Sequence, residues 1–275
     1  MITVGKFFHK DPSLKVWFVG DFDNPVNGSV SIKDLSGNGF HGTPQNSDSA
    51  DPNIARITSN WRSRDGLRIR ASSSKNGPYF TFPVWNSSAD NITMLVWFIF
   101  YGMVIDDGGD SGKTQALIST ANNDTNTFLS MGLSAQTSNI RISSGGRTST
   151  NPSINFFSKS FIYPRKVYCV AITKNNSLRQ IYVNGVLENQ ITNDYTGYTV
   201  NSPMVGGQEG NVSPWRYHLN ADILEIACFS RALSPSEISQ YYNWAISNPK
   251  RNTLIIDPSL LYNPAISRRR LLLTR

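Results

Sequence analysis

The feature that most constrains the fold lies near the C-terminus, where a strand-like run passes through a turn into a helix. Ser234 can cap this helix, Pro235 suits its first position, and Glu237 can complete a capping box. Apolar residues then recur at helical spacing, at Ile238, Tyr241, Tyr242, Ala245 and Ile246. We therefore expect one short helix that packs one face against the rest of the protein.

This helix is the one convincing helix that the sequence predicts. Charged residues make up only 16% of the 275 residues and aromatic residues 11%, while glycine reaches 20 residues. That composition suits many strands joined by turns, and the length allows a sizeable core. No period of 20–50 residues repeats, which argues against a propeller or a solenoid. We predict an all-β fold.

Turn chemistry marks two further places. After a predicted opening strand at 15–23, the segment 31–43 reads SIKDLSGNGFHGT, and its Gly and Asn residues tolerate positive φ. Asn184-Gly185 stands between alternating apolar residues, which is a strong hairpin signal. Two more strands are predicted at 92–98 and 167–173.

These segments, in this order, resemble laminin-G-like domains of the concanavalin A-like lectin/glucanase superfamily. The resemblance covers roughly residues 15–245 and rests on DLSGNGFHGT, the aromatic strand ITMLVWF, the hairpin ending in YVNG, and RALSPSEI. It implies a two-sheet antiparallel jelly-roll sandwich with one short C-terminal helix. We expect Trp17, Trp97 and Tyr182 between the sheets, and Ile238 and Tyr241 at the sandwich edge. The superfamily includes binders and enzymes, so function must be argued from sites.

We assign residues 1–248 to the sandwich and residues 249–275 to an extended C-terminal arm. Polar clusters predict long surface loops at 106–127 and 143–153. Three prolines exclude one continuous helix in the arm. Most of the net charge of +7 also belongs to the arm, because residues 1–249 hold 20 basic and 18 acidic residues. A basic field over the whole surface is therefore not expected.

The arm ends in a basic and apolar run that suits docking onto another protein. Arginines can bind carboxylates of a partner, and leucines are unfavourable in water. The run lacks interleaved aromatic residues, which disfavours nucleic acid. Laminin-G-like domains of tailed bacteriophages often end similarly, so the resemblance implies a virion component with other virion proteins as partners, present in several copies or as a homo-oligomer. The docking residues are Arg268, Arg269, Arg270, Leu271, Leu272 and Leu273.

Enzymatic motifs are weak. Glycoside hydrolysis needs two carboxyl groups at one sugar, and none of the four Glu lies two or four residues from a second carboxylate. Asp222 and Glu225 are three apart, which predicts opposite faces of a strand. The segment Gly108–Thr114 is one residue short of a phosphate-binding loop. Three scattered His and two Cys do not suit zinc. We predict no enzyme; His41 is expected to form structural hydrogen bonds, and Cys169 and Cys228 to be buried free thiols.

Binding sites are less constrained by the sequence. Aromatic rings beside turns could stack on sugars, and the candidates are Trp61, Trp85, Trp215 and Tyr217. No cofactor is expected, and the resemblance allows only calcium. Its candidate ligands are Asp106, Asp107 and Asp110, although solvated loop acids are the favoured interpretation.

The N-terminus lacks a basic start followed by a long apolar core, and the apolar run at 94–105 is too short to cross a bilayer. We therefore expect synthesis in a host cytoplasm, assembly into a virion, and no membrane partner. The leading hypothesis is a non-enzymatic structural protein of a phage particle, as capsid decoration, tail or fibre. The first alternative is a carbohydrate-binding module for host-surface glycans, and the second is a glycoside hydrolase.

Overall fold

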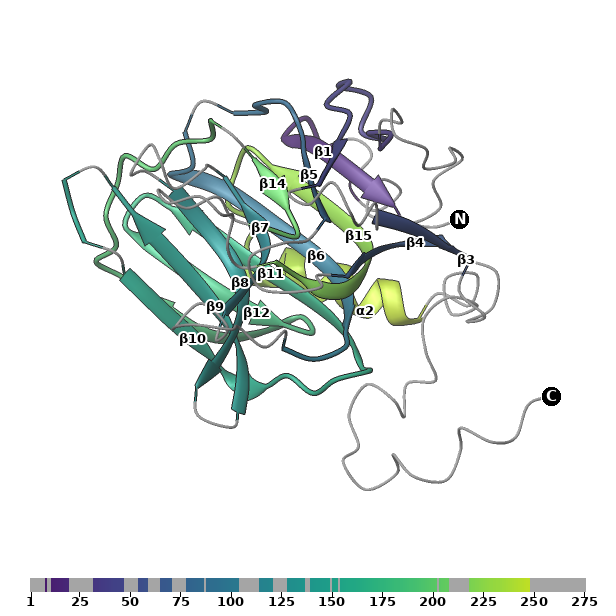
Figure 1. Cartoon of the computed structure of the whole chain (residues 1–275). Helices are drawn as coiled ribbons and strands as arrows, with labels where there is room; N and C mark the ends of the chain where they lie inside the picture. The colour runs from purple at the N-terminus through teal and green to yellow at the C-terminus, as the bar shows by residue number, and fades with distance from the viewer. Residues whose placement is uncertain are drawn as a thin grey trace.

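The chain folds into two antiparallel β-sheets that face each other, and in the part that the structure describes one short helix lies on the outside (Figure 1). This computed structural model describes residues 8, 11–19, 32–46, 54–58, 65–70, 78–86, 88–103, 114–120, 128–136, 139–148, 150–152, 154–201, 203–207 and 218–247. The prediction of an all-β jelly-roll sandwich with one short C-terminal helix is confirmed.

The larger sheet has eight strands, in the order β13-β12-β11-β6-β15-β4-β3, with β1 paired to β15. Their bounds are β1 Leu14–Val19, β3 Ile54–Thr58, β4 Asp65–Arg70, β6 Asn91–Phe100, β11 Val167–Asn175, β12 Leu178–Val183, β13 Val186–Ile191 and β15 Asn220–Phe229. The strands expected at 92–98 and 167–173 therefore exist as β6 and β11, and they pair with each other from Val167 opposite Ile99 onwards.

The smaller sheet has seven strands, in the order β10-β9-β8-β7-β14-β5-β2. Their bounds are β2 Thr43–Asn46, β5 Pro78–Thr81, β7 Thr114–Ser119, β8 Phe128–Gln136, β9 Asn139–Arg147, β10 Ile154–Phe161 and β14 Met204–Val205. Two of these strands correct the sequence prediction. β7 lies inside the expected loop at 106–127, and β9 runs into the expected loop at 143–153, because its small polar residues occupy buried sheet positions.

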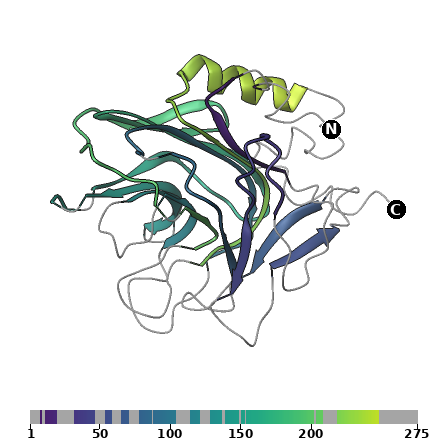
Figure 2. The same cartoon turned by 90° about the horizontal axis from the view of Figure 1, so that it is seen from above.

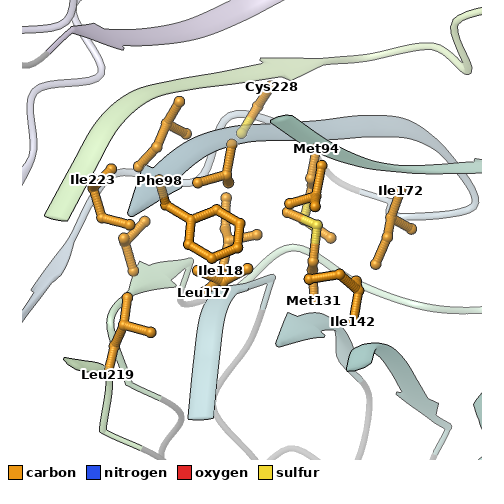
Figure 3. Packing of buried hydrophobic residues seen from close by; sticks show 14 of the residues in the cluster. Met94, Phe98, Leu117, Ile118, Met131, Ile142, Ile172, Leu219, Ile223 and Cys228 are labelled. Atoms are coloured by element: carbon orange, nitrogen blue, oxygen red, sulfur yellow. The ribbon is translucent and has the colours of Figure 1, made fainter. Parts of the chain in front are cut away.

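The main core fills the space between the sheets. Side chains of β6 and β15 meet those of β7, β8 and β9 there, including Met94, Phe98, Ile118, Met131 and Ile142 (Figure 3). Alternate residues of these strands point inward, as the two-residue period of a strand requires. This cluster is continuous along the sandwich and accounts for most of its buried apolar surface.

A second apolar cluster lies on the other face of the eight-stranded sheet, under helix α2 (Pro235–Ser247). Figure 2 shows α2 lying across that sheet on the side away from the smaller sheet. Trp97 and Tyr182 are buried here and not between the sheets, Trp17 is only half-buried at its margin, and Ile238 and Tyr241 pack on the sheet face and not on its edge. The predicted location was wrong because both faces of β6 are apolar, so alternation alone could not say which face a residue takes.

The predicted helix start is confirmed in detail. The amide of Glu237 donates to Oγ of Ser234 at 3.3 Å, and the amide of Ser234 donates to Oε2 of Glu237 at 2.7 Å. These are the reciprocal bonds of a capping box. Arg231 binds Glu237 at 2.6 Å and Asp11 at 2.5 Å, which joins the start of the helix to the segment before β1.

The DLSGNGFHGT segment is built around one buried carboxylate. Asp34 accepts hydrogen bonds from the amides of Trp17, Ser36 and Phe40 at 2.9–3.0 Å. The amide of Asp34 in turn donates to Nδ1 of His41 at 3.1 Å, which confirms the structural role predicted for that histidine. This hub fixes the loop to β1, so the motif serves the fold.

The hairpin predicted from Asn184-Gly185 is also confirmed. Both residues have positive φ, 52° and 80°, and Val183 pairs with Val186 across the turn. A Cβ on Gly185 would lie 2.8 Å from Cβ of Tyr242. Glycine therefore also allows α2 to approach the turn closely.

The assignment of 249–275 as a separate arm lies outside the described residues, and it stays a prediction. In the part of the chain that the structure describes, no helix is long and apolar enough to cross a membrane.

Candidate functional site: the outer face of the seven-stranded sheet

The face of the seven-stranded sheet that points away from the core carries small and polar residues. Leu129 and Met131 of β8 point into the core. Ser130 between them must point outward, and so must Gly145 and Asn155, which follow it in register on β9 and β10. We call this surface the polar face: Ser130, Gly132, Ser134, Ser143, Gly145, Arg147 and Asn155.

Glycines leave the centre of the polar face without protruding side chains. A Cβ on Gly145 would lie 2.7 Å from Oδ1 of Asn155 and 3.0 Å from Oγ of Ser130, so these three residues meet at one place. A Cβ on Gly132 would lie 2.5 Å from the carbonyl oxygen of Gln115. Neither glycine leaves room for a larger residue without movement, and the absence of side chains brings the hydroxyl and amide groups close to the backbone.

Arginine and aromatic side chains border the polar face along β9 and β10. The guanidinium carbon of Arg141 lies 4.9 Å from the ring centre of Phe161, and Nε of Arg141 is buried without a hydrogen-bond partner. Phe157 and Phe161 are half-buried, and Arg147 stands at the far end of β9. Asn155 is exposed and Arg147 is half-buried, whereas Ser130, Ser134 and Ser143 are only 5–9% exposed. An amide, guanidinium groups and partly exposed rings are therefore the groups of this face that suit a ligand with many hydroxyl groups.

The aromatic candidates from the sequence do not form this face. Trp85 is 5% exposed and packs in the core between the sheets, so its assignment as an exposed stacking ring was wrong. The segment after β5 carries this ring inward, although its composition is typical of a turn. Trp61, Trp215 and Tyr217 lie outside the described residues, as do the docking residues 268–273.

The proposed calcium ligands Asp106, Asp107 and Asp110 also lie outside the described residues. Among the residues that the structure does describe, no group of three or more His, Cys, Asp or Glu side chains could hold a metal ion. Cys169 and Cys228 are both buried thiols, as predicted, and burial raises the pKa of Cys228.

Asp222 and Glu225 lie on the same face of β15, and the prediction of opposite faces was wrong. The register shifts between Ile223 and Glu225, so Asp222 stands opposite Ile99 and Glu225 opposite Trp97. A β-bulge of this kind inserts one extra residue into the strand, so the alternation of side chains between the two faces shifts by one residue. Glu225 therefore takes the same face as Asp222. The sequence gives no signal for this bulge that we could recognise.

Both carboxylates are buried and hydrogen-bonded within the protein. Asp222 binds Arg68 at 2.8 Å and accepts from the hydroxyl of Tyr101 at 2.6 Å. Burial, with this bond, raises the pKa of Tyr101 to about 12. Glu225 accepts from Nε1 of Trp17 at 3.1 Å and from the hydroxyl of Tyr241 at 3.2 Å. These bonds join β15 to β1, β4 and α2, which is a structural role.

A group of buried charges, unforeseen from the sequence, closes one end of the core. Oδ2 of Asp194 lies 3.1 Å from Nζ of Lys174 and 3.0 Å from Nε of Arg179, and all three side chains are fully buried. The hydroxyl of Tyr198 donates to Asp194 at 3.0 Å. Desolvation lowers the pKa of Lys174, although Asp194 opposes this effect. Arg179 also donates to the carbonyl of Ile154 in the other sheet, so the group ties the two sheets together.

The molecule is therefore a lectin-like β-sandwich in which one outer face is covered by a helix and the other carries polar groups. A family model described as the concanavalin A-like lectin/glucanases superfamily matches residues 73–239. That match spans more than half of the chain, so the chain belongs to this superfamily. No curated protein sequence matches it significantly.

Solved structures share the fold at low sequence identity. Domain 4 of AbnA, a GH43 extracellular arabinanase from Geobacillus stearothermophilus, solved with arabinotriose, is 17% identical with a TM-score of 0.57, and the match covers 83% of this chain and 97% of that one. The binding domain of botulinum neurotoxin DC in complex with SialylT is 15% identical with a TM-score of 0.58, over 84% of this chain and 51% of that one. The same toxin domain with rat synaptotagmin II is 16% identical with a TM-score of 0.56, with the same coverage of both chains. This chain thus spans about half the length of the toxin domains.

Proposed function

We propose that this protein is a non-enzymatic carbohydrate-recognition domain that binds glycans on its polar face. The observation that carries the proposal is the meeting of Ser130, Gly145 and Asn155 at the centre of that face. Sugars present several hydroxyl groups at fixed spacing, and such ligands suit several short donors and acceptors on a rigid sheet. Arg141 and Arg147 add donors at the border, which favours glycans with carboxylate groups among the candidates.

Two of the similar structures support a binding role. The arabinanase domain was solved with arabinotriose, and one toxin domain with SialylT. Their identities of 15–17% limit the inference from them to the fold. The choice of glycan for this chain therefore rests on the groups of the polar face, and binding must be measured.

We also propose that the domain does not hydrolyse glycans, and the state of the carboxylate pair Asp222 and Glu225 supports this part of the proposal. Asp222 is held by Arg68 and Tyr101, and Glu225 by Trp17 and Tyr241. A general acid needs to reach a glycosidic oxygen, and these groups are 3% and 2% exposed. We expect no release of reducing sugar from any glycan that binds. Turnover by the wild type that is lost in Glu225→Gln would contradict this part of the proposal.

The direct test is affinity electrophoresis or a glycan array with the whole chain and two variants of the polar face. Asn155→Ala and Arg147→Ala should each weaken retention about tenfold, the effect of a lost hydrogen bond or charged contact. Asn243→Ala serves as the matched control, because Asn243 is exposed on α2 on the opposite side of the molecule. Retention that is equal in all four proteins would place binding elsewhere, and no retention at all would reject the proposal.

A second role is favoured by the sequence of residues 249–275 alone. We propose that this segment fixes the domain to a larger particle, for which a tailed-phage virion is the candidate that the resemblance implies. Deleting residues 252–275 should leave the melting temperature similar and should abolish incorporation into particles. A truncated protein that still assembles, or that fails to fold, would contradict this role.

A further inference from the structure

Exposed apolar side chains gather at one corner of the sandwich. Among the described residues, the large hydrophobic side chains with more than a third of their surface exposed are Val84, Tyr163, Val186 and Leu187. Val84 follows β5, whereas the other three lie where β10 ends and where the β12–β13 hairpin turns. Isolated exposed hydrophobic residues need no explanation, but a group of them often marks a contact surface.

Hydrogen bonds show that these two segments converge. Asn189 of β13 donates to the carbonyl of Phe157, and Glu188 accepts from the amide of Ser160. β10 and β13 therefore run beside each other in opposite directions, so the end of β10 lies near the start of β13 at Val186 and Leu187. The amide of Tyr163 then donates to the hydroxyl of Tyr168 at 2.9 Å. The next residue, Cys169, bonds to Asn184 in the hairpin turn.

Three cations lie in β10 or in the segment between β10 and β11 that carries Tyr163. Lys159 and Arg165 are exposed, and Nζ of Lys166 lies 5.1 Å from the ring centre of Tyr163. No ion pair involves any of the three within the described chain. We call Lys159, Tyr163, Arg165, Lys166, Val186 and Leu187 the basic corner.

Among the described residues of this corner, the acid Glu188 binds the backbone of β10. Glu188 accepts from the amides of Lys159 and Ser160 at 3.0 and 2.9 Å and from the hydroxyl of Ser160 at 2.7 Å. Its carboxylate covers amide groups at the edge of β10 that would otherwise lack partners. Glu188 keeps its negative charge in these bonds, so the described residues of the corner carry three cations and one anion.

Arg165 provides an independent sign that its side chain matters. It has a φ of 63°, in the left-handed region that favours glycine, and its amide donates to the carbonyl of Phe100 at 2.6 Å. A glycine would meet the backbone requirement without the steric cost of a Cβ. An exposed arginine at such a position points to a use outside the fold.

We propose that the basic corner docks an acidic segment of a partner protein that carries apolar side chains between its carboxylates. Charge complementarity to Lys159, Arg165 and Lys166 supplies attraction and orientation. The aliphatic side chains of Val186 and Leu187 offer apolar contact that favours a peptide with apolar residues over an acidic glycan. Addition of a partner strand to β13 is disfavoured, because the register of this edge strand shifts at Glu188 and the resulting bulge interrupts the ladder. This role is independent of glycan binding on the polar face.

The test uses fluorescence anisotropy of the whole chain with a short labelled peptide in which glutamates alternate with leucine and phenylalanine. The wild type should bind it, and Arg165→Glu with Lys166→Glu should weaken binding at least about tenfold. Lys33→Glu is the charge control, because Lys33 is exposed in the segment before β2. A peptide with serines in place of the apolar residues should bind more weakly than the original, which distinguishes docking from general attraction.

A second variant separates binding from folding. Arg165→Gly should raise the melting temperature, because it removes the left-handed arginine, and should still weaken peptide binding. Equal loss of binding in Lys33→Glu would show that only net charge matters and would overturn the proposal. So would failure of the peptide to bind while heparin or phosphatidylserine vesicles do. Retention of glycans by the polar face is measured alongside and should be unchanged in the corner variants, so failure of one proposal is distinguishable from failure of the other.

Discussion

The two outer faces of this sandwich differ in the side chains that they carry and in what covers them. The outer face of the eight-stranded sheet carries Trp97, Tyr182 and other apolar side chains, and α2 covers it. The outer face of the seven-stranded sheet carries Ser130, Ser143 and Asn155, and no helix of the described chain covers it. A sheet can bury one face against its partner sheet, so the fate of its other face is left to the sequence.

The difference separates a face whose side chains serve folding from a face on which we propose binding. Under α2, Trp97 donates to the hydroxyl of Tyr241 at 2.9 Å and stacks on Tyr242 at 5.8 Å between ring centres. Such packing stabilises the domain and leaves nothing for a ligand. On the polar face Ser130 and Ser143 are at most 9% exposed, whereas Asn155 is exposed, so the proposed binding depends first on Asn155 and the bordering arginines. The following predictions test this contrast, from the largest effect to the smallest.

Trp97→Ala should have the largest effect. It removes a fully buried ring and its bond to Tyr241, and we expect a loss of about 3–5 kcal/mol in the free energy of unfolding. Urea denaturation followed by circular dichroism measures this loss. Asn243→Ala on the exposed side of α2 is the control. A loss below about 1 kcal/mol would mean that the helix-covered face is not a true second core.

Ser234→Ala should have an intermediate effect on the same face. The hydroxyl of Ser234 accepts the amide of Glu237, and removing an N-cap of this kind costs about 1 kcal/mol. The helix should still form, because Ile238, Tyr241 and Ala245 remain buried. Thermal unfolding with Asn243→Ala on the same helix as the control checks the result, and an unchanged melting temperature would show that packing alone sets the helix start.

Low pH should weaken this helix cap and lower the free energy of unfolding. The hydrogen bond from Arg231 lowers the pKa of Glu237 to about 2. Because the folded pKa lies below the unfolded value, the contribution is fully present above the unfolded pKa and is lost as pH falls towards about 2. Both side chains are about a third exposed, so the contribution should stay near 1 kcal/mol. Glu237→Gln should flatten that part of the stability profile, and a profile identical to that of the wild type would contradict the assignment.

The sequence predicted the parts of the fold that local chemistry determines. The capping box at Ser234, the turn at Asn184 and the strand at β6 all depend on neighbours in the chain, and all three are confirmed. The face to which Trp97 points was not predictable, because β6 is apolar on both sides. The single bulge in β15 moved Glu225 to the face of Asp222, and such a register shift is decided by pairing between distant strands.

The candidate site was harder to predict than the fold. The search for exposed aromatic rings selected Trp85, which its segment carries into the core. The serines and glycines in the second half of β9 were interpreted as loop composition, although Ser143 lies in a strand and is almost covered. A polar strand face and a polar loop have the same composition, and only pairing between strands separates them.

The smallest effect on stability should come from Ser143→Ala. Ser143 points away from the core beside Gly132 and opposite Phe157, and its replacement removes one hydroxyl from the polar face without opening a cavity. We expect a change within about 0.5 kcal/mol in unfolding free energy, together with weaker glycan retention. The same experiments as for Trp97→Ala measure the first quantity, and affinity electrophoresis measures the second. If Ser143→Ala destabilises the protein as strongly as a core substitution, the polar face is part of the folding core, and the contrast between the two outer faces is lost.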